Sequence, residues 1–166
     1  MAKKDIHIDR LREFAVKHSK LGCYSIHGIS HWDRVARNAD ALQTSDVDSL
    51  VVKAFAYIHD VERINESDDW QHGHRAALLV DEIRSSVLGF LNDQEIEQLK
   101  DACRLHTLRH RTEDATVNAC FDADRLDLGR VGMTPNPDKM ATVQGRILAE
   151  KMMEVNPEED WLLNGG

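Results

Sequence analysis

Apolar residues recur along this chain at the three- and four-residue spacing of helices, and nowhere alternate with polar residues between turn signals as they do in strands. The spacing predicts helices over about residues 5–19, 31–42, 47–58, 116–128 and 141–153. Two further helices are predicted where apolar stripes run from Ala76 to Val87 and from Ile96 to His110. The expected fold class is therefore all-α, a compact single-domain bundle of about six or seven helices.

Local signals predict several helix boundaries. The segment Ser30-His31-Trp32-Asp33 has the form of a capping box, so we expect the second helix to begin near His31. Gly22 lies just beyond the expected end of the first helix, and Pro135 and Pro137 mark a loop before the last one. A polar tail should follow the last helix. Since no repeat or linker divides the chain, we expect residues 1–166 to form one domain.

The composition narrows the classes of function. A net charge of −8 disfavours broad electrostatic binding to nucleic acid or anionic lipid, so a phosphate-bearing substrate must meet a local basic patch. We find no apolar run with the length of a signal peptide or a membrane span, and we expect a cytoplasmic protein. Three cysteines in separate contexts argue against a disulfide framework. Whether the chain forms a homodimer is left open by its sequence.

Two histidines and two acids are expected to point into the core. The apolar helix over residues 47–58 runs directly into His59 and Asp60, His31 lies in the first turn of its helix, and Asp124 is an acid on an apolar helical face. Buried carboxylates need a compensating cation. Two imidazoles and two carboxylates suit a divalent ion such as Mn, Fe, Zn, Mg, Co or Ni. The sequence therefore predicts a metal site with these four ligands.

The order of these residues resembles a known family. A His, then an adjacent His-Asp pair, then a distant Asp is the pattern of the HD superfamily of metal-dependent phosphohydrolases. The matching segments are His27-Gly28-Ile29-Ser30-His31-Trp32-Asp33-Arg34-Val35, His59-Asp60 and Asp122-Ala123-Asp124-Arg125-Leu126. By this resemblance, which covers about residues 27–128, the ligands are His31, His59, Asp60 and, in the last segment, Asp124 rather than Asp122.

The resemblance implies hydrolysis of a phosphomonoester or phosphodiester, commonly of a nucleotide or another small phosphorylated metabolite. One ion, or two, would activate a water molecule for attack on phosphorus. We assign catalytic roles to Asp60 and to Arg34, which shares the ligand face of its helix. For Arg34, contact with phosphate and a salt bridge that supports the ligands are equal alternatives.

Further histidines would enlarge the site. By resemblance, His72 and His106 correspond to ligands of a second ion in some members, with substrate phosphate or polar packing as alternatives. The cyclic-dinucleotide phosphodiesterase branch has two adjacent histidines where this chain has His106-Thr107, and the Gly-Tyr-Pro segment of that branch is lacking. His27, expected in the loop over the site, and His110 are further candidates for a second ion or for the substrate phosphate, with capping of the entrance as the alternative for His27. His110 should continue the inward stripe of Cys103 and His106, three residues that offer zinc ligands as a weaker alternative.

Three arginines close in sequence to the candidate ligands are expected to bind substrate, namely Arg63, Arg75 and Arg109. A guanidinium fork suits phosphate oxygens, although each arginine has pairing with an acid as its alternative.

Two rival functions stay open. The same scaffold with a two-iron site can activate oxygen, so a di-iron oxygenase is the alternative closest in chemistry. A regulatory or binding module without catalysis is the alternative from another class, but this chain has every matching ligand.

Overall fold

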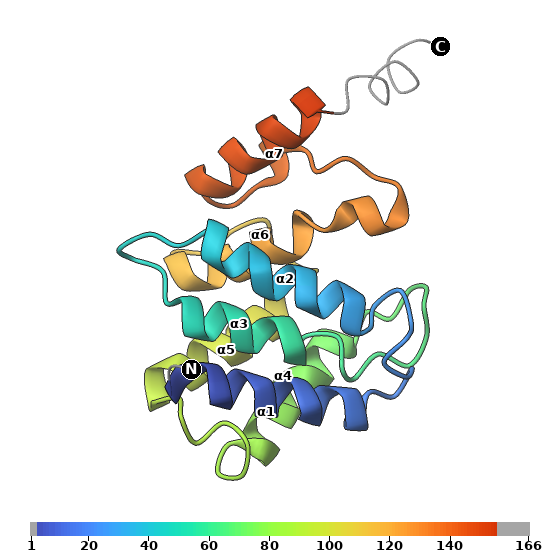
Figure 1. The fold of residues 1–166 in the computed structure, drawn as a ribbon, viewed down its shortest axis with the longest axis vertical. Helices are drawn as coiled ribbons and strands as arrows, with labels where there is room; N and C mark the ends of the chain where they lie inside the picture. Colours follow the sequence, from blue (N-terminus) through green and yellow to red (C-terminus); the bar gives the residue numbers. More distant parts are fainter. Residues whose placement is uncertain (1–2, 156–166) are drawn as a thin grey trace.

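The computed structural model describes residues 3–155, and these residues form helices without a single strand among them (Figure 1). The α-helices are α1 (Lys3–His18), α2 (Ile29–Ala41), α3 (Ser49–Ile58), α4 (His72–Ile83), α5 (Asp93–Leu105), α6 (Ala115–Arg125) and α7 (Val143–Val155). Two short 3-10 helices, η1 (Leu128–Val131) and η2 (Pro137–Lys139), lie between α6 and α7. The prediction of an all-α fold is confirmed. The expected polar tail lies largely within residues 156–166, outside the described residues.

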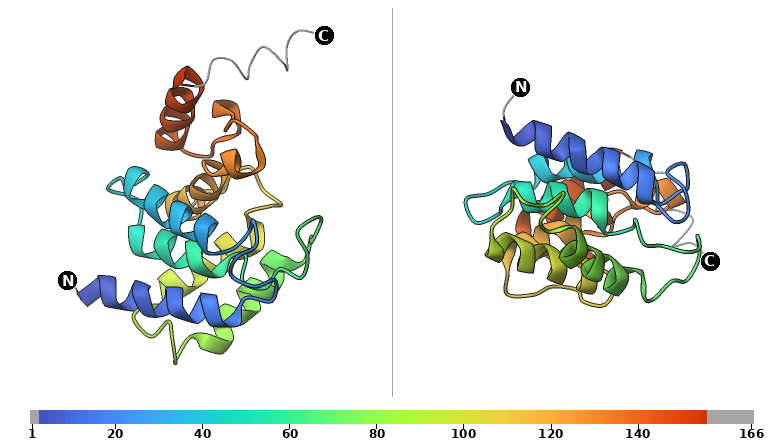
Figure 2. Two further views of the ribbon diagram at one scale, coloured as in Figure 1. Left: turned by 45° about the vertical axis from the view of Figure 1, so that its right-hand side comes forward. Right: turned by 90° about the horizontal axis from the view of Figure 1, so that it is seen from below.

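Helix α3 lies at the centre of the bundle and packs against α1, α2, α5 and α6 (Figure 2). From Val51 to Ile58 every residue except Lys53 is buried, so the helix is apolar on nearly all sides. Such a helix is stable only when other helices surround it. Its N-terminus is capped by Asp48, whose side chain accepts from the Leu50 backbone N–H at 2.9 Å. The next residues, His59 and Asp60, are thereby delivered to the middle of the protein.

The predicted capping box at the start of α2 is wrong. Helix α2 begins at Ile29, Gly28 is its N-cap, and no side chain caps it in the described structure. Asp33 instead accepts hydrogen bonds from Arg12 Nε at 2.8 Å and from Tyr57 Oη at 3.0 Å. Arg12 on α1 and Tyr57 on α3 thus bind the Asp33 carboxylate in place of a backbone N–H at the start of α2. The carboxylate of Asp33 joins three helices.

Helix α5 is shorter than its apolar stripe suggested. It ends at Leu105, His106 is its C-cap, and the chain then leaves the helix. His110 is therefore exposed, and the prediction that it points inward with Cys103 and His106 is wrong. Helix α6 likewise ends at Arg125 rather than near residue 128, because the chain tightens into η1.

Helix α7 is anchored by a buried acid of α6. The carboxylate of Asp122 accepts from the backbone N–H groups of Ala141 and Thr142 and from Thr142 Oγ1, at 2.7, 2.8 and 2.7 Å. A Cβ at Gly145 would lie 2.2 Å from Asp122 Oδ2, so this position has no room for a side chain. Helix α7 follows α6 at one end of the molecule, opposite α1 (Figures 1 and 2). In the described range, no helix combines the length and the hydropathy needed to cross a membrane.

We expect Asp33→Asn to destabilise the fold in a pH-dependent manner. Hydrogen bonds from Arg12 hold the pKa of Asp33 below its usual value, so the carboxylate stabilises the fold above about pH 4 and loses this effect as the pH falls through the folded pKa. The variant should lose about 1 kcal/mol of unfolding free energy at pH 7, with the difference shrinking at pH 3. Urea unfolding at both pH values measures this. Asp46→Asn, on an exposed loop, is the control, and a pH-independent deficit would contradict the assignment.

Candidate metal centre

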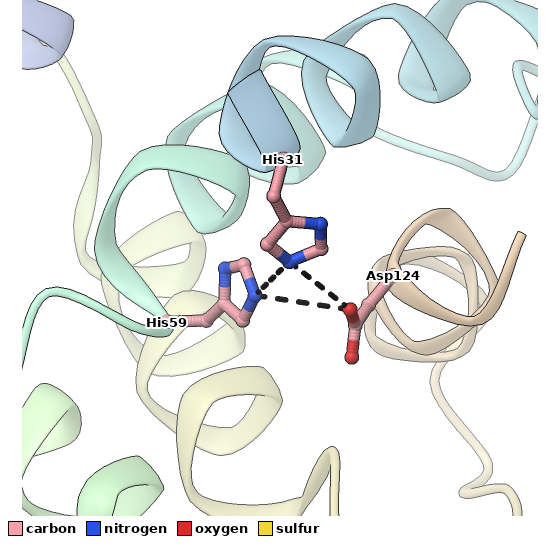
Figure 3. A group of neighbouring side chains, drawn as sticks. All are labelled: His31, His59 and Asp124. Carbon is pink, nitrogen blue, oxygen red and sulfur yellow. Dashed lines mark hydrogen bonds and ion pairs between the residues drawn. The ribbon is translucent and has the colours of Figure 1, made fainter. Parts of the chain in front are cut away.

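Three side chains from three segments meet beside the end of α3 (Figure 3). His31 comes from the first turn of α2, His59 from the C-cap of α3 and Asp124 from the last turn of α6. The two Nε2 atoms are 3.2 Å apart, and Asp124 Oδ1 lies 3.3 Å from His31 Nε2 and 3.9 Å from His59 Nε2. Both imidazoles are fully buried, while the side chain of Asp124 is 20% exposed. These three ligand atoms could hold one metal ion.

A second group consists of Asp60, His72 and His106. His72 opens α4 and His106 follows α5, and their Nε2 atoms are 2.9 Å apart. Asp60 Oδ1 lies 3.3 Å from His72 Nε2. All three residues are buried. His72 and His106 were expected to bind a second ion or the substrate phosphate. The structure places both of them next to the His-Asp pair.

Asp60 faces both groups. Its Oδ2 lies 3.4 Å from His59 Nε2 and 3.7 Å from His31 Nε2, whereas its Oδ1 faces His72. His27, from the loop before α2, contacts the same Oδ2 through Nδ1 at 3.0 Å. A carboxylate in this position can ligate an ion in either group or bridge two ions.

The second nitrogen of three imidazoles is engaged by a backbone carbonyl. The Nδ1 atoms of His59, His72 and His106 contact the carbonyl oxygens of Phe55, Asp69 and Cys103 at 3.0, 2.5 and 2.8 Å. Because a carbonyl oxygen only accepts, each Nδ1 must carry the hydrogen and donate it. In the neutral imidazole, Nε2 is then left with a bare lone pair. Burial, the largest influence, lowers the pKa of all three histidines and so favours this neutral form.

His31 is held by a carboxylate instead. Its Nδ1 donates to Asp127 Oδ2 at 2.6 Å, so its Nε2 also faces the ligand group. Burial alone would lower the pKa of His31, but the neighbouring carboxylates of Asp124 and Asp127 outweigh burial and the net shift is upward. A proton on His31 Nε2 and a divalent ion would compete for the same place among His31, His59 and Asp124. Metal binding should therefore weaken as the pH falls.

The donor set fits a metal ion for two reasons. The lone pairs of the neutral His72 and His106 Nε2 atoms face each other at 2.9 Å, an arrangement that is repulsive unless a cation lies between them. His31 Nε2 lies 3.2 Å from the neutral His59 Nε2, where a proton or a metal ion can lie. Asp124 Oδ1 is buried and has no hydrogen-bond partner among the described residues. Burial acts to raise the pKa of Asp124 and of Asp60, but neighbouring imidazoles outweigh it and both carboxyls remain ionised. Imidazole nitrogens and carboxylate oxygens are ligands for the borderline divalent ions.

Two residues that sequence reasoning missed support this site. Asp127 accepts from His31, and it also binds Arg34, whose Nε and Nη2 donate to Oδ1 and Oδ2 at 2.5 and 3.1 Å. Arg130 lies beside the same two acids, with Nη1 donating to the Asp127 carbonyl at 3.1 Å and Nη2 3.7 Å from Asp124 Oδ1. The spacing of three residues from Asp124 to Asp127 to Arg130 was the available signal. Two alternatives were given for Arg34, contact with phosphate or a salt bridge that supports the ligands. The structure shows the salt bridge.

The arginines expected to bind substrate are placed differently. Arg63 lies at the second group, with Nη1 3.8 Å from Asp60 Oδ1 and Nη2 donating to the Ser67 carbonyl at 2.7 Å. Arg75 donates to the Glu62 carbonyl and to Asp69 Oδ2, which fixes the loop whose Asp69 carbonyl accepts from His72. Arg109 is exposed, as is His110, and no contact described for either side chain reaches the two ligand groups. The structure therefore brings Arg63 to the centre and leaves Arg75 and Arg109 outside it.

Comparison with known proteins supports the fold. No family model matches the sequence, and no curated protein matches it either. A similar solved structure is that of a predicted HD superfamily hydrolase from an uncultured Thermotogales bacterium. The two chains are 23% identical over 98% of this chain and 92% of the other, with a TM-score of 0.67. The expected HD-type fold is thereby confirmed, whereas the roles of individual residues rest on the geometry described above.

We expect Asp127→Asn to weaken metal binding although Asp127 is not among the proposed ligands. The amide removes the charge that orients His31 and raises its basicity, and loss of such a partner typically costs about 10- to 100-fold in metal affinity. Calorimetric titration with Mn²⁺ or Co²⁺ measures the change. The control is Asp138→Asn, on the exposed η2 helix. Equal affinity in the Asp127 variant and the parent would contradict this role.

Proposed function

We propose that this protein is a metal-dependent phosphohydrolase that acts on a nucleotide or another small phosphorylated metabolite. His31, His59, Asp60 and Asp124 would hold one divalent ion, and Asp60, His72 and His106 a second. When bound, such ions lower the pKa of a coordinated water toward neutrality and neutralise phosphoryl oxygens. The observation that carries the proposal is the set of four buried imidazoles whose Nε2 lone pairs face one another and two carboxylates.

The charges around the ligands favour an anionic substrate. Among the described residues, each carboxylate at the site has a guanidinium beside it, with Asp60 next to Arg63, Asp124 next to Arg130 and Asp127 next to Arg34. These pairs cancel, so each divalent ion would add net positive charge in a largely buried site. A phosphate ester supplies the compensating negative charge.

The protein residues around the ligands would orient the reacting groups. His27 donates to Asp60 and is 12% exposed, so it fixes the shared carboxylate from the loop before α2. Phe55 and Cys103 hold His59 and His106 through their carbonyls. Since these partners belong to helices α3 and α5, the ligand positions are set by the rigid part of the bundle.

A second candidate function is a di-iron oxygenase. The observation that favours it is the division of the ligands into two groups with Asp60 between them, which suits two iron ions as well as two other divalent ions. Iron content together with substrate-dependent oxygen consumption would distinguish this function from hydrolysis. A non-catalytic module is less well supported, because both ligand groups are complete.

We expect metal-dependent hydrolysis that is lost in Asp124→Asn. Protein purified under metal-sparing conditions should be analysed for its elements and then assayed against phosphomonoesters and phosphodiesters with Mn, Co, Mg and Ni. The variant loses a charged ligand, so its kcat/KM should fall at least about a hundredfold. Asp138→Asn again serves as the control. Unchanged metal binding and turnover in the Asp124 variant would refute the assignment.

We further expect two ions per chain in the parent and one in His106→Gln. The substitution removes Nε2 from the second group and leaves His31, His59 and Asp124 in place. Elemental analysis after saturation with Mn²⁺ and gel filtration measures the stoichiometry. A parent that binds one ion, or a variant that still binds two, would contradict the assignment of the second group.

A further inference from the structure

Arg130 carries an unused donor in a buried position. Its side chain is 10% exposed, and its Nε has no hydrogen-bond partner among the described residues. The neighbouring Nη1 and Nη2 lie near the Asp127 carbonyl and Asp124 Oδ1. A buried N–H without an acceptor is unfavourable, so it points to an oxygen that a ligand supplies.

The other arginines at the site use their donors differently. Arg34 donates through Nε and Nη2 to the carboxylate of Asp127. Arg63 donates through Nη2 to the Ser67 carbonyl, and its Nε lies 3.4 Å from the Asn65 carbonyl. Both are thus committed to protein acceptors, whereas Arg130 keeps Nε unpaired beside a candidate ligand.

Among the four proposed ligands of the first ion, Asp124 is the most exposed. The side chain of Asp124 is 20% exposed, compared with 3% for Asp60 and 0% for His31. Arg130 lies 3.7 Å from the Asp124 oxygen that faces the imidazoles. The guanidinium of Arg130 therefore lies beside the most exposed of these ligands.

We propose that Arg130 binds the phosphate of the substrate. The inference rests on the proposed function and adds a substrate-binding residue to it. A guanidinium offers several donors in one plane, so Nε can donate to a phosphate oxygen while Nη1 and Nη2 stay near the Asp127 carbonyl and Asp124 Oδ1.

Two variants test the role of Arg130 independently of turnover. Arg130→Gln removes the charge, Arg130→Lys keeps it without the fork, and Arg146→Gln removes an exposed arginine of α7 as a control. Binding of inorganic phosphate to each Mn-loaded protein is measured by calorimetry, and metal content by elemental analysis. We expect the Gln variant to retain its metal and to bind phosphate at least about tenfold more weakly, with the Lys variant intermediate and the control unchanged.

Turnover of p-nitrophenyl phosphate and of bis(p-nitrophenyl) phosphate tests the same contact with a bound substrate. Arg130→Gln should raise KM about tenfold or more for whichever compound the parent hydrolyses. Phosphate affinity within twofold of the parent in both Arg130 variants, or loss of metal together with phosphate, would overturn the contact. Phosphate binding that Arg130→Gln weakens, in a parent that hydrolyses neither compound, would overturn the hydrolase proposal and leave the contact standing. A parent that binds no phosphate and hydrolyses neither compound would overturn both proposals.

Discussion

Four buried histidines each donate a hydrogen bond from Nδ1, and these bonds determine which ligand atoms the centre of this protein offers to a metal ion. Phe55, Asp69 and Cys103 offer backbone carbonyls, and Asp127 offers a carboxylate. Each bond fixes both the ring orientation and the position of the hydrogen, so every Nε2 presents a lone pair to the same small volume. Two of these acceptors lie in the last turns of α3 and α5, where His59 and His106 fold back onto carbonyls of their own helices. The ends of the helices are therefore part of the site.

This arrangement opposes stability unless cations are present, and the surrounding core must offset its cost. Helix α3 supplies most of that compensation, because its residues from Val51 to Ile58 are almost all buried against four other helices. Burial of apolar side chains contributes on the order of 1.5–3 kcal/mol each. A binding site built at the end of such a helix is held rigidly, and rigid placement is what metal coordination requires.

The sequence predicted the elements that local periodicity controls, and its errors lie where distant partners decide. The apolar stripes predicted an all-α fold, and the buried faces selected His31, His59, Asp60 and Asp124, which the structure brings together. The capping box failed because Asp33 binds Arg12, 21 residues away, and no local pattern reveals that partner. His110 was misplaced because α5 ends at Leu105, although the apolar spacing continues beyond it. Asp127 was missed because the predicted helix continued to about residue 128, whereas α6 ends at Arg125. Arg130 was missed because it follows the predicted helix, where a period of 3.6 residues no longer applies.

The change of helix type after α6 explains why these two residues belong to the site. The backbone N–H of Asp127 bonds to the Asp124 carbonyl, and that of Arg130 bonds to the Asp127 carbonyl, each across three residues. A helix with three residues per turn aligns side chains at this spacing, whereas a continued α-helix would rotate them progressively away from one another. Asp124, Asp127 and Arg130 are thus presented on one side, as a ligand, as the support of His31 and as a donor for an anion. Asp122, two residues before Asp124, lies on another side of α6 and anchors α7 instead. A single stretch of nine residues therefore connects the metal centre to the end of the bundle.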